Sequence, residues 1–281
     1  MAIAAGEYYS NAIVGSMNVG ADVNLLAVDA NPKYPIGQLI QRADGNIYHY
    51  GYSSSGVAAG TLVAPTFASS GQSAITRGTY GPTSSTAVAG DAIQPCAKGS
   101  RFVELDGTNV TALASATANL YRGGYFITSS GSGTGYTYRI KGNTAYGNPV
   151  SAHLRIELKE PLQYQVNATT VWMIVPCMWN DLIAADVATN TSVSGVSMGT
   201  TTSTYPYGWF CTRGIVGVVQ TGTITAGQAV MLSTATSGTV AAFGIGASQA
   251  TSFIGQDSIG QCLQPANATG GLCTIFLSSI D

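Results

Sequence analysis

The chain consists largely of short β-rich segments that are separated by turn residues at short, fairly regular intervals. Typical segments are SRFVEL, AHLRIEL, TVWMIVP, GIVGVVQTG and LCTIFLSSI. This spacing is typical of antiparallel sandwiches and barrels rather than of βαβ units. Helix-forming residues are scarce, and the best helical candidate is a short stretch from Ser115 to Tyr121, which Gly123 could cap. We therefore predict an all-β fold of antiparallel β-sandwich or β-barrel modules with almost no helix.

The clearest unit is GQLIQRADGNIYHYGY, in which Asp44-Gly45 separates two β-rich arms. An Asp-Gly pair in this position is a strong signal for a two-residue hairpin turn. Because side chains alternate along a strand, the second arm is expected to present two different faces. These faces carry Tyr48, Tyr50 and Tyr52 on one side, and Ile47 and His49 on the other.

Changes in composition divide the chain into three predicted parts. Residues 1–34 lack a strong hairpin signal and end at NPKYP, which indicates an extended N-terminal arm. Residues 35–176 are predicted to form one β-rich domain, and residues 177–281 a C-terminal β-rich domain. Within the latter, the Thr/Ser-rich residues 187–204 are expected to act as a linker.

Charged residues make up only 9% of the 281 residues, against about 25% in an ordinary soluble domain. The sequence contains no basic block, so nucleic acid is not expected as a partner. No run approaches the roughly 18 apolar residues of a spanning helix, and no secretory signal is visible, so no membrane is expected either. A weakly charged surface offers little protection against association. We infer that neighbours cover much of it, as in an obligate oligomer or a shell.

The cysteines are widely spaced, odd in number and without a C-x-x-C pair, which speaks against a disulfide framework or a zinc site. They are expected to be buried, reduced thiols that act as small hydrophobic side chains. The five are Cys96, Cys177, Cys211, Cys262 and Cys273.

The glycine-rich stretch SSGSGTGYTYRIKGN, residues 129–143, resembles a phosphate-binding loop at first sight. Such a loop needs a helix after it, and the Walker version needs a lysine directly after its last glycine. Here Tyr136 follows Gly135, and the segment YTYRIK is strand-like. We predict a hairpin with Tyr136, Tyr138 and Ile140 on one strand face, and Arg139 and Lys141 on the other.

Three patterns could indicate catalysis or metal binding, and none has the context that it needs. The GVSMG stretch around Ser197 matches a hydrolase elbow, but its flanks are loop-like and no histidine follows it. His49 and His153 lie far apart and in no metal-binding pattern. Glu157 and Glu160 are three positions apart, which places them on opposite faces of a strand rather than as a glycosidase pair. We expect no enzyme activity, catalytic residue, metal or cofactor.

The aromatic residues leave two interpretations open. The face of Tyr48, Tyr50 and Tyr52 and the run YPYGWF, residues 205–210, could be platforms that stack on sugars. They could equally be core or subunit interface, which is the interpretation we favour because aromatic residues on strand faces usually pack.

Two segments resemble the head decoration, or cement, proteins of tailed bacteriophages. YPIGQLIQRADGNIYHYGYSSSGVAAGTLVAP, residues 34–65, is similar to the opening module of that group, with its P-x-G segment, D-G hairpin and AAG-x-L. TANLYRGGYFITSSGSGTGYTYRIKGN, residues 117–143, is similar to a later module. The end of the chain, from GIVGVVQTG onwards, resembles the closing strands, so the resemblance covers about two-thirds of the chain in patches.

The resemblance implies a β-rich virion protein without catalytic residues, assembled in the bacterial host cytoplasm and bound to the outer surface of the head. Its partners would be the major capsid protein and itself, with a homotrimer favoured and a dimer possible. The N-terminal arm would lie across an adjacent capsid subunit. The alternative that we keep is a carbohydrate-binding or adhesin-like β module of a phage tail or fibre.

Overall fold

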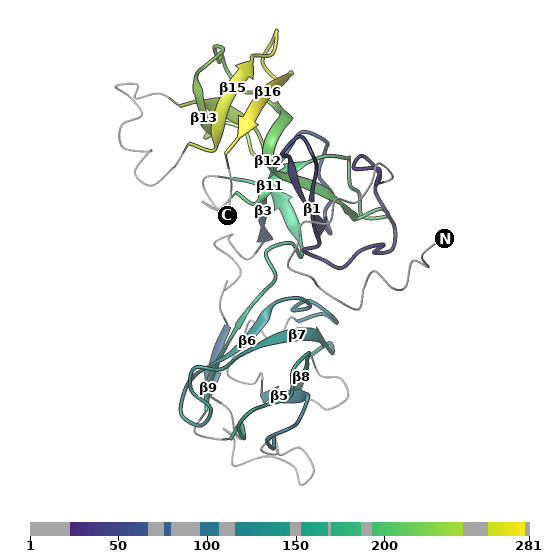
Figure 1. Cartoon of the computed structure of the whole chain (residues 1–281), viewed down its shortest axis with the longest axis vertical. Helices are drawn as coiled ribbons and strands as arrows, with labels where there is room; N and C mark the ends of the chain where they lie inside the picture. Colours follow the sequence, from purple (N-terminus) through teal and green to yellow (C-terminus); the bar gives the residue numbers. More distant parts are fainter. Residues whose placement is uncertain are drawn as a thin grey trace.

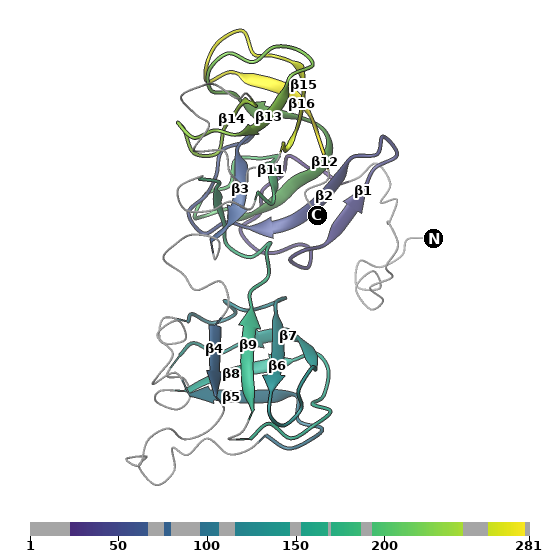
Figure 2. The ribbon, with the colours of Figure 1, turned by 90° about the vertical axis from the view of Figure 1, so that its left-hand side faces the viewer.

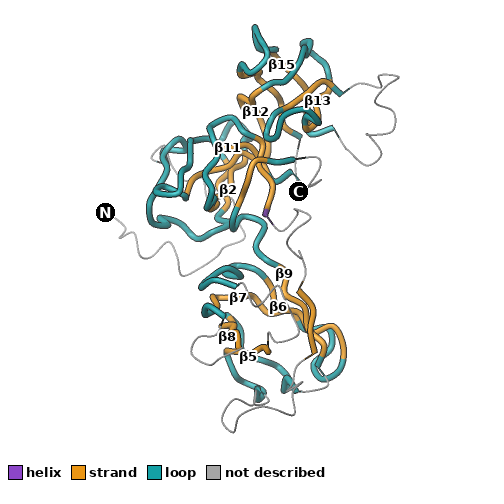
Figure 3. The backbone as a smooth tube through the Cα atoms, turned by 180° about the vertical axis from the view of Figure 1, so that it is seen from behind, coloured by secondary structure: helices purple, strands orange, loops and turns teal. Residues whose placement is uncertain are grey.

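The computed structural model describes residues 23–66, 76–79, 96–106, 116–146, 153–167, 170–186, 193–243 and 258–278. These residues contain sixteen strands and no α-helix, and every pairing between strands is antiparallel. The all-β prediction is therefore confirmed. The strands form two sheets, which lie in two bodies one above the other (Figures 1 and 2). In Figure 3, strands and loops account for almost all of the described chain.

The larger sheet lies in a body that we call the split domain. Its strand order is β10-β3-β11-β12-β16-β15-β13-β14, and the β1–β2 hairpin joins it because β2 also pairs with β12. Its strands are β1 (Leu39–Gln41), β2 (Ile47–Tyr52), β3 (Leu62–Pro65), β10 (Leu182–Ala184), β11 (Gly195–Ser197), β12 (Tyr207–Val219), β13 (Ala229–Leu232), β14 (Val240–Ala242), β15 (Gly260–Gln264) and β16 (Leu272–Leu277).

The smaller sheet lies in a body that we call the inserted domain, because its residues fall between β3 and β10 in sequence. Its strand order is β4-β9-β6-β7-β8-β5. The strands are β4 (Thr76–Thr79), β5 (Phe102–Asp106), β6 (Tyr125–Ser130), β7 (Thr137–Asn143), β8 (His153–Leu158) and β9 (Val171–Val175).

The strand pairing divides the chain differently from the predicted boundary at residue 176. Strand β2 pairs with β12, and β3 pairs with both β10 and β11, so residues 39–65 share a sheet with the C-terminal strands. The predicted segment 35–176 therefore contains pieces of two bodies. The reason is that a strand sequence shows its burial pattern but does not show which distant strand completes its hydrogen bonds.

Part of the predicted N-terminal arm packs against the split domain. Residues 1–22 lie outside the described residues. From there on, Leu25 is buried in the core, and the backbones of Asp29 and Tyr207 exchange hydrogen bonds of 2.9 and 3.2 Å. The aromatic ring of Tyr34 packs against Tyr50 and Trp209 at centroid distances of 5.2 and 5.1 Å. Residues 23–34 thus belong to the folded body.

The predicted linker contains a strand of the larger sheet. Residues 187–192 lie outside the described residues, but Gly195, Val196 and Ser197 form β11 and are all buried between β3 and β12. Small side chains let the neighbouring strands approach closely, since a Cβ on Gly195 would lie 2.7 Å from the carbonyl oxygen of Cys211. The linker prediction is therefore wrong for residues 193–201. The Ser and Gly residues there allow close packing of strands and do not form a flexible connection.

Two local predictions differ in detail. The Asp44-Gly45 hairpin forms, but its loop runs from Arg42 to Asn46, with Gly45 at φ 86°. This is a longer hairpin loop with glycine at the left-handed position. The helix expected from Ser115 to Tyr121 is replaced, over the described residues from 116 onwards, by turns. Asn119 has φ 63°, a left-handed conformation that a right-handed helix cannot contain.

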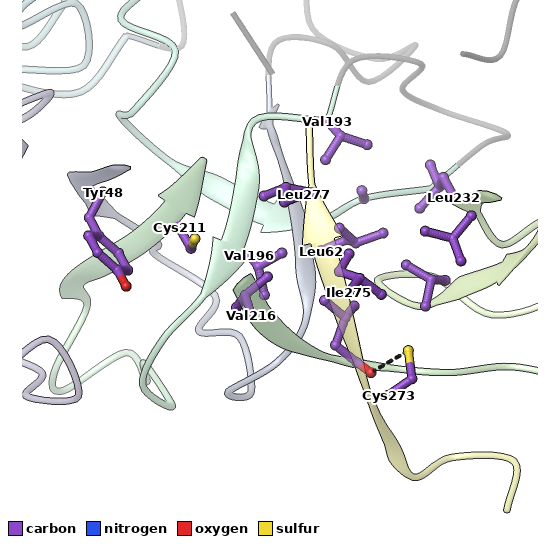
Figure 4. Close-up of a cluster of buried hydrophobic side chains, with 14 of the residues drawn as sticks. Tyr48, Leu62, Val193, Val196, Cys211, Val216, Leu232, Cys273, Ile275 and Leu277 are labelled. Atoms are coloured by element: carbon purple, nitrogen blue, oxygen red, sulfur yellow. Dashed lines mark hydrogen bonds between the residues drawn. The ribbon is translucent and has the colours of Figure 1, made fainter. Parts of the chain in front are cut away.

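Each domain has its own hydrophobic core. In the split domain, side chains from β3, β11, β12 and β16 meet, and Figure 4 shows Leu62, Val196, Val216, Ile275 and Leu277 pointing toward one another. The inserted domain is filled by a separate set that includes Phe126, Trp172 and Ile156.

All five cysteines are buried and free, as expected for small hydrophobic side chains. Burial raises the pKa of the Cys211 thiol to about 12 and that of Cys273 to about 11. These thiols therefore stay protonated and unreactive near neutral pH. No helix in the described part of the chain has the length and apolar character needed to span a membrane.

Candidate functional site

The structure separates the residues of the possible hydrolase triad. Ser197 is 2% exposed, and its hydroxyl donates a 2.7 Å hydrogen bond to the carbonyl oxygen of Gly199. Strand β12 lies between Ser197 and His49, since both pair with Phe210. The His49 ring stacks on Trp179 at 4.3 Å, and His153 belongs to the inserted domain. Ser197 is thus a buried strand residue and does not form the exposed nucleophile of an elbow.

The two glutamates of the possible glycosidase pair each contact strand β7. Glu157 forms an ion pair of 3.4 Å with Lys141, and Glu160 accepts a 3.0 Å hydrogen bond from the backbone amide of Arg139. Both carboxylates are exposed. In the described ranges, no group of three or more His, Cys, Asp or Glu residues could hold a metal ion.

The glycine-rich stretch is a hairpin between β6 and β7, which confirms the prediction. The amide of Gly135 donates to the carbonyl of Thr128 at 2.8 Å, and the amide of Thr128 donates to the carbonyl of Tyr136 at 3.0 Å. Gly131, Gly133 and Gly135 all have φ between 77° and 87°, which glycine adopts without steric cost. Along β7, Tyr138 and Ile140 are buried while Arg139 and Lys141 are exposed.

The tyrosines of the predicted aromatic face lie in two different environments, the core and the surface of a cleft. Tyr48 and Tyr50 are 3% and 0% exposed and belong to the core, which confirms the packing interpretation for them. Tyr52, at the end of β2, instead lies at the surface of a cleft beside Tyr207, with ring centroids 5.0 Å apart. Burial raises the pKa of Tyr52, and the charge of Asp181 raises it further, so its hydroxyl stays neutral.

The cleft has a volume of about 860 Å³ and lies where the two domains meet. The side-chain amide of Asn180 donates a 2.6 Å hydrogen bond across this junction to the carbonyl oxygen of Leu120. The residues that line the cleft are Pro32, Lys33, Tyr34, Pro35, Ile36, Tyr52, Ser54, Thr117, Ala118, Asn119, Leu120, Arg122, Asn180, Asp181 and Tyr207. Aromatic rings and hydrogen-bonding groups thus converge in one concave surface.

Two lining residues have unusual backbone conformations. Asn119 and Asp181, at φ 63° and 66°, are the described non-glycine residues with positive φ, and both line the cleft. The Asp181 carboxylate accepts hydrogen bonds from the backbone amide of Ser54 at 3.2 Å and from its hydroxyl. Left-handed non-glycine residues concentrate at functional sites, where the surrounding structure holds them. The cleft is therefore a candidate ligand site.

A second candidate surface is the outer face of strands β12, β16 and β15, which we call the apolar face. Its exposed large side chains are Ile215 (55%), Leu272 (61%), Phe276 (44%) and Leu263 (44%). Ile215 lies directly opposite Phe276 in the strand register. The remaining outward positions of the paired strands carry Gly217, Val219, Thr274 and Gln261, which are uncharged. The charged residue at the edge of this face is Arg213, which is exposed on β12 just before the residues that pair with β16.

The centre of the apolar face is open. A Cβ on Gly217 would meet no atom within 4 Å, so another molecule can approach the backbone closely there. An uncharged apolar patch on a sheet is typical of a protein-protein interface. The outer face is exposed although GIVGVV and LCTIFL are nearly continuous apolar runs, which characterise strands covered on both sides. The sequence analysis did not identify the apolar face, although these two runs were a signal that could have indicated it.

No family model, curated protein or solved structure that was compared with this chain matches it.

Proposed function

We propose that this chain is a non-enzymatic structural protein of a tailed-phage virion that binds the outer surface of the head and joins neighbouring capsomers. The observation that carries the proposal is the apolar face, because a large exposed apolar surface on a sheet marks a site of interaction with another protein. The low overall charge and the resemblance of residues 34–65 and 117–143 to cement proteins support the same function.

In this proposal the protein acts mechanically. The apolar face holds copies of the chain together as a homo-oligomer, with a trimer favoured, and each copy contacts the major capsid protein. Several weak contacts in one oligomer raise the effective concentration of each, so the clip stays bound although no single contact is strong. In the same proposal, residues 1–22 are the arm that contacts an adjacent capsid subunit.

Deleting residues 2–22 tests the arm. The deletion ends before Leu25 and Asp29, because both contact the split domain and their loss would damage the fold. We expect the shortened chain to keep the thermal unfolding transition of the full chain and to bind heads at least tenfold more weakly. Co-sedimentation with purified heads that lack the protein measures this. Unchanged saturation of the heads by the shortened chain would contradict the role of the arm.

The cleft favours a second function, carbohydrate binding by a tail or fibre module. Tyr34, Tyr52 and Tyr207 offer ring surfaces on which a sugar can stack, and Asn119, Asn180 and Asp181 offer hydrogen-bonding groups. If this is the function, a glycan array should show specific binding by the full chain. Tyr52→Ala should then abolish it, whereas Tyr205→Ala, at an exposed tyrosine outside the cleft, should not. If the array shows no specific binding, the cleft does not recognise glycans and this second function is contradicted.

A further inference from the structure

The cationic residues of the chain are concentrated in the inserted domain. Residues 76–175 contain eight of the eleven Lys and Arg residues but five of the thirteen Asp and Glu residues. Their formal charge is therefore +3, while the rest of the chain carries −5. The sequence shows no basic block because these cations come from separate segments, and the fold brings four of them to one place.

Four of the cations line one groove of about 550 Å³ on the β5–β8–β7 sheet. Arg101 precedes β5, Lys141 lies on β7, Arg155 lies on β8 and Lys159 follows β8. The guanidinium of Arg101 donates a hydrogen bond to the backbone carbonyl of Lys159, which fixes one end of the groove. The cations therefore surround one concave surface rather than extending separately into solvent.

Arg155 is the best-positioned of these residues for binding a ligand. Its guanidinium lies 3.9 Å from the centre of the Phe102 ring, and its Nε atom is buried without a hydrogen-bond partner. Among the described residues, no carboxylate forms an ion pair with Arg155. A guanidinium that packs against a ring loses rotational freedom, so its planar set of donors is better ordered for binding a carboxylate.

The remaining charges of the groove are poorly neutralised. The Lys141–Glu157 pair measures 3.4 Å, but both side chains are more than half exposed, so the pair is weak and easily exchanged. Burial lowers the pKa of Lys159, and the charges of Arg139 and Arg122 lower it further, while the neighbouring Glu160 offsets part of this shift. Positive charge thus accumulates here, and an incoming anion would relieve it.

We propose that this groove binds an acidic segment of a partner protein, with a carboxylate on the Arg155 guanidinium and a backbone amide or hydroxyl donor on Glu157. The carboxylate of Glu157 favours a peptide over a nucleic acid as the partner. A nucleic acid would place repeated phosphates against Glu157 and the nearby Glu104, which pairs with Arg155 in the register, whereas a peptide offers both carboxylates and N–H donors. That the segment belongs to the capsid surface rests on the proposed function.

The groove is tested with the full chain and a blocked peptide, acetyl-Gly-Asp-Gly-Asp-Gly-amide, in an NMR titration. We expect saturable binding that weakens with salt, and at least tenfold weaker binding by Arg155→Gln and Lys159→Gln. Lys98→Gln removes the same charge from an exposed position outside the groove and should bind like the unchanged chain. Because Lys159 is exposed, its variant keeps the test valid if Arg155→Gln unfolds.

Three results would overturn the inference. They are equal binding of the matching Asn peptide, unchanged binding by Lys159→Gln in a folded protein, and tighter binding of inorganic phosphate or a twelve-nucleotide single strand than of the Asp peptide. A measurement of binding to phage heads distinguishes the groove proposal from the proposed function. If the Lys159→Gln chain loses the peptide but still saturates heads, the capsid is not the source of the segment. If the unchanged chain binds the peptide but no head, the proposed function fails and the groove stands.

Discussion

Replacing Ile215 with Asp is expected to turn an oligomeric protein into a monomer that keeps its fold. Ile215 is one of the exposed large side chains of the apolar face, 55% exposed in the single chain and opposite Phe276. An association through this face would bury the new carboxylate among the uncharged outward side chains of β16 and β15, because the outward cation of β12, Arg213, precedes the residues that pair with β16. An uncompensated buried charge costs about 3 kcal/mol or more, which is roughly a hundredfold in an association constant.

Sedimentation velocity over a range of concentrations measures this effect, with thermal unfolding as the check on the fold. Thr137→Asp is the matched control, since Thr137 is an exposed strand residue of the inserted domain and lies away from the apolar face. The control should sediment like the unchanged chain. If Ile215→Asp and the unchanged chain sediment alike at every concentration, the apolar face does not hold copies together.

The second large effect is expected at Val196, where Asp should prevent the split domain from folding. Val196 is 0% exposed and lies in β11, which forms hydrogen bonds with β3 on one side and β12 on the other. A carboxylate at this position is surrounded by the apolar core shown in Figure 4. The cost of several kcal/mol is comparable to the 5–15 kcal/mol by which a domain is stable.

Circular dichroism during thermal unfolding, together with the yield of folded protein, measures this change. Ser203→Asp places the same side chain in the same Thr/Ser-rich stretch at an exposed position and should change stability by no more than about 0.5 kcal/mol. If Val196→Asp unfolds at the same temperature as the control, residues 195–197 do not form a central strand and the assignment of β11 is wrong.

Features that depend on neighbouring residues could be read from the sequence. Both hairpins were predicted because turn chemistry is local: Gly45 and Gly135 occupy left-handed positions that few other residues tolerate. Alternation along the strand placed Tyr48 and Tyr50 on one face, and their burial confirms the favoured interpretation that aromatic residues on strand faces pack. The close packing of strands at a glycine was harder to predict from the sequence. Gly195 in β11 was assigned to a flexible linker, because the residues that pack against it come from other strands.

Features that depend on distant partners could not be read from the sequence. Nothing in β3 indicates that it pairs with β10 and β11, more than a hundred residues later, so the inserted domain was not recognised. Tyr52, Tyr207 and Asn119 line the same cleft although they are distant in sequence. Arg101, Lys141 and Arg155 likewise line the same groove. Each site is assembled from strands whose order only the fold establishes.

Cryo-electron microscopy of the virion that contains this chain tests the proposed function most directly. The comparison is between virions made with and without the protein. We predict additional density at symmetry-related positions on the outside of the head, into which the split and inserted domains fit, with density between adjacent capsomers. Its absence from the head, or its presence on a tail or fibre instead, would contradict the account.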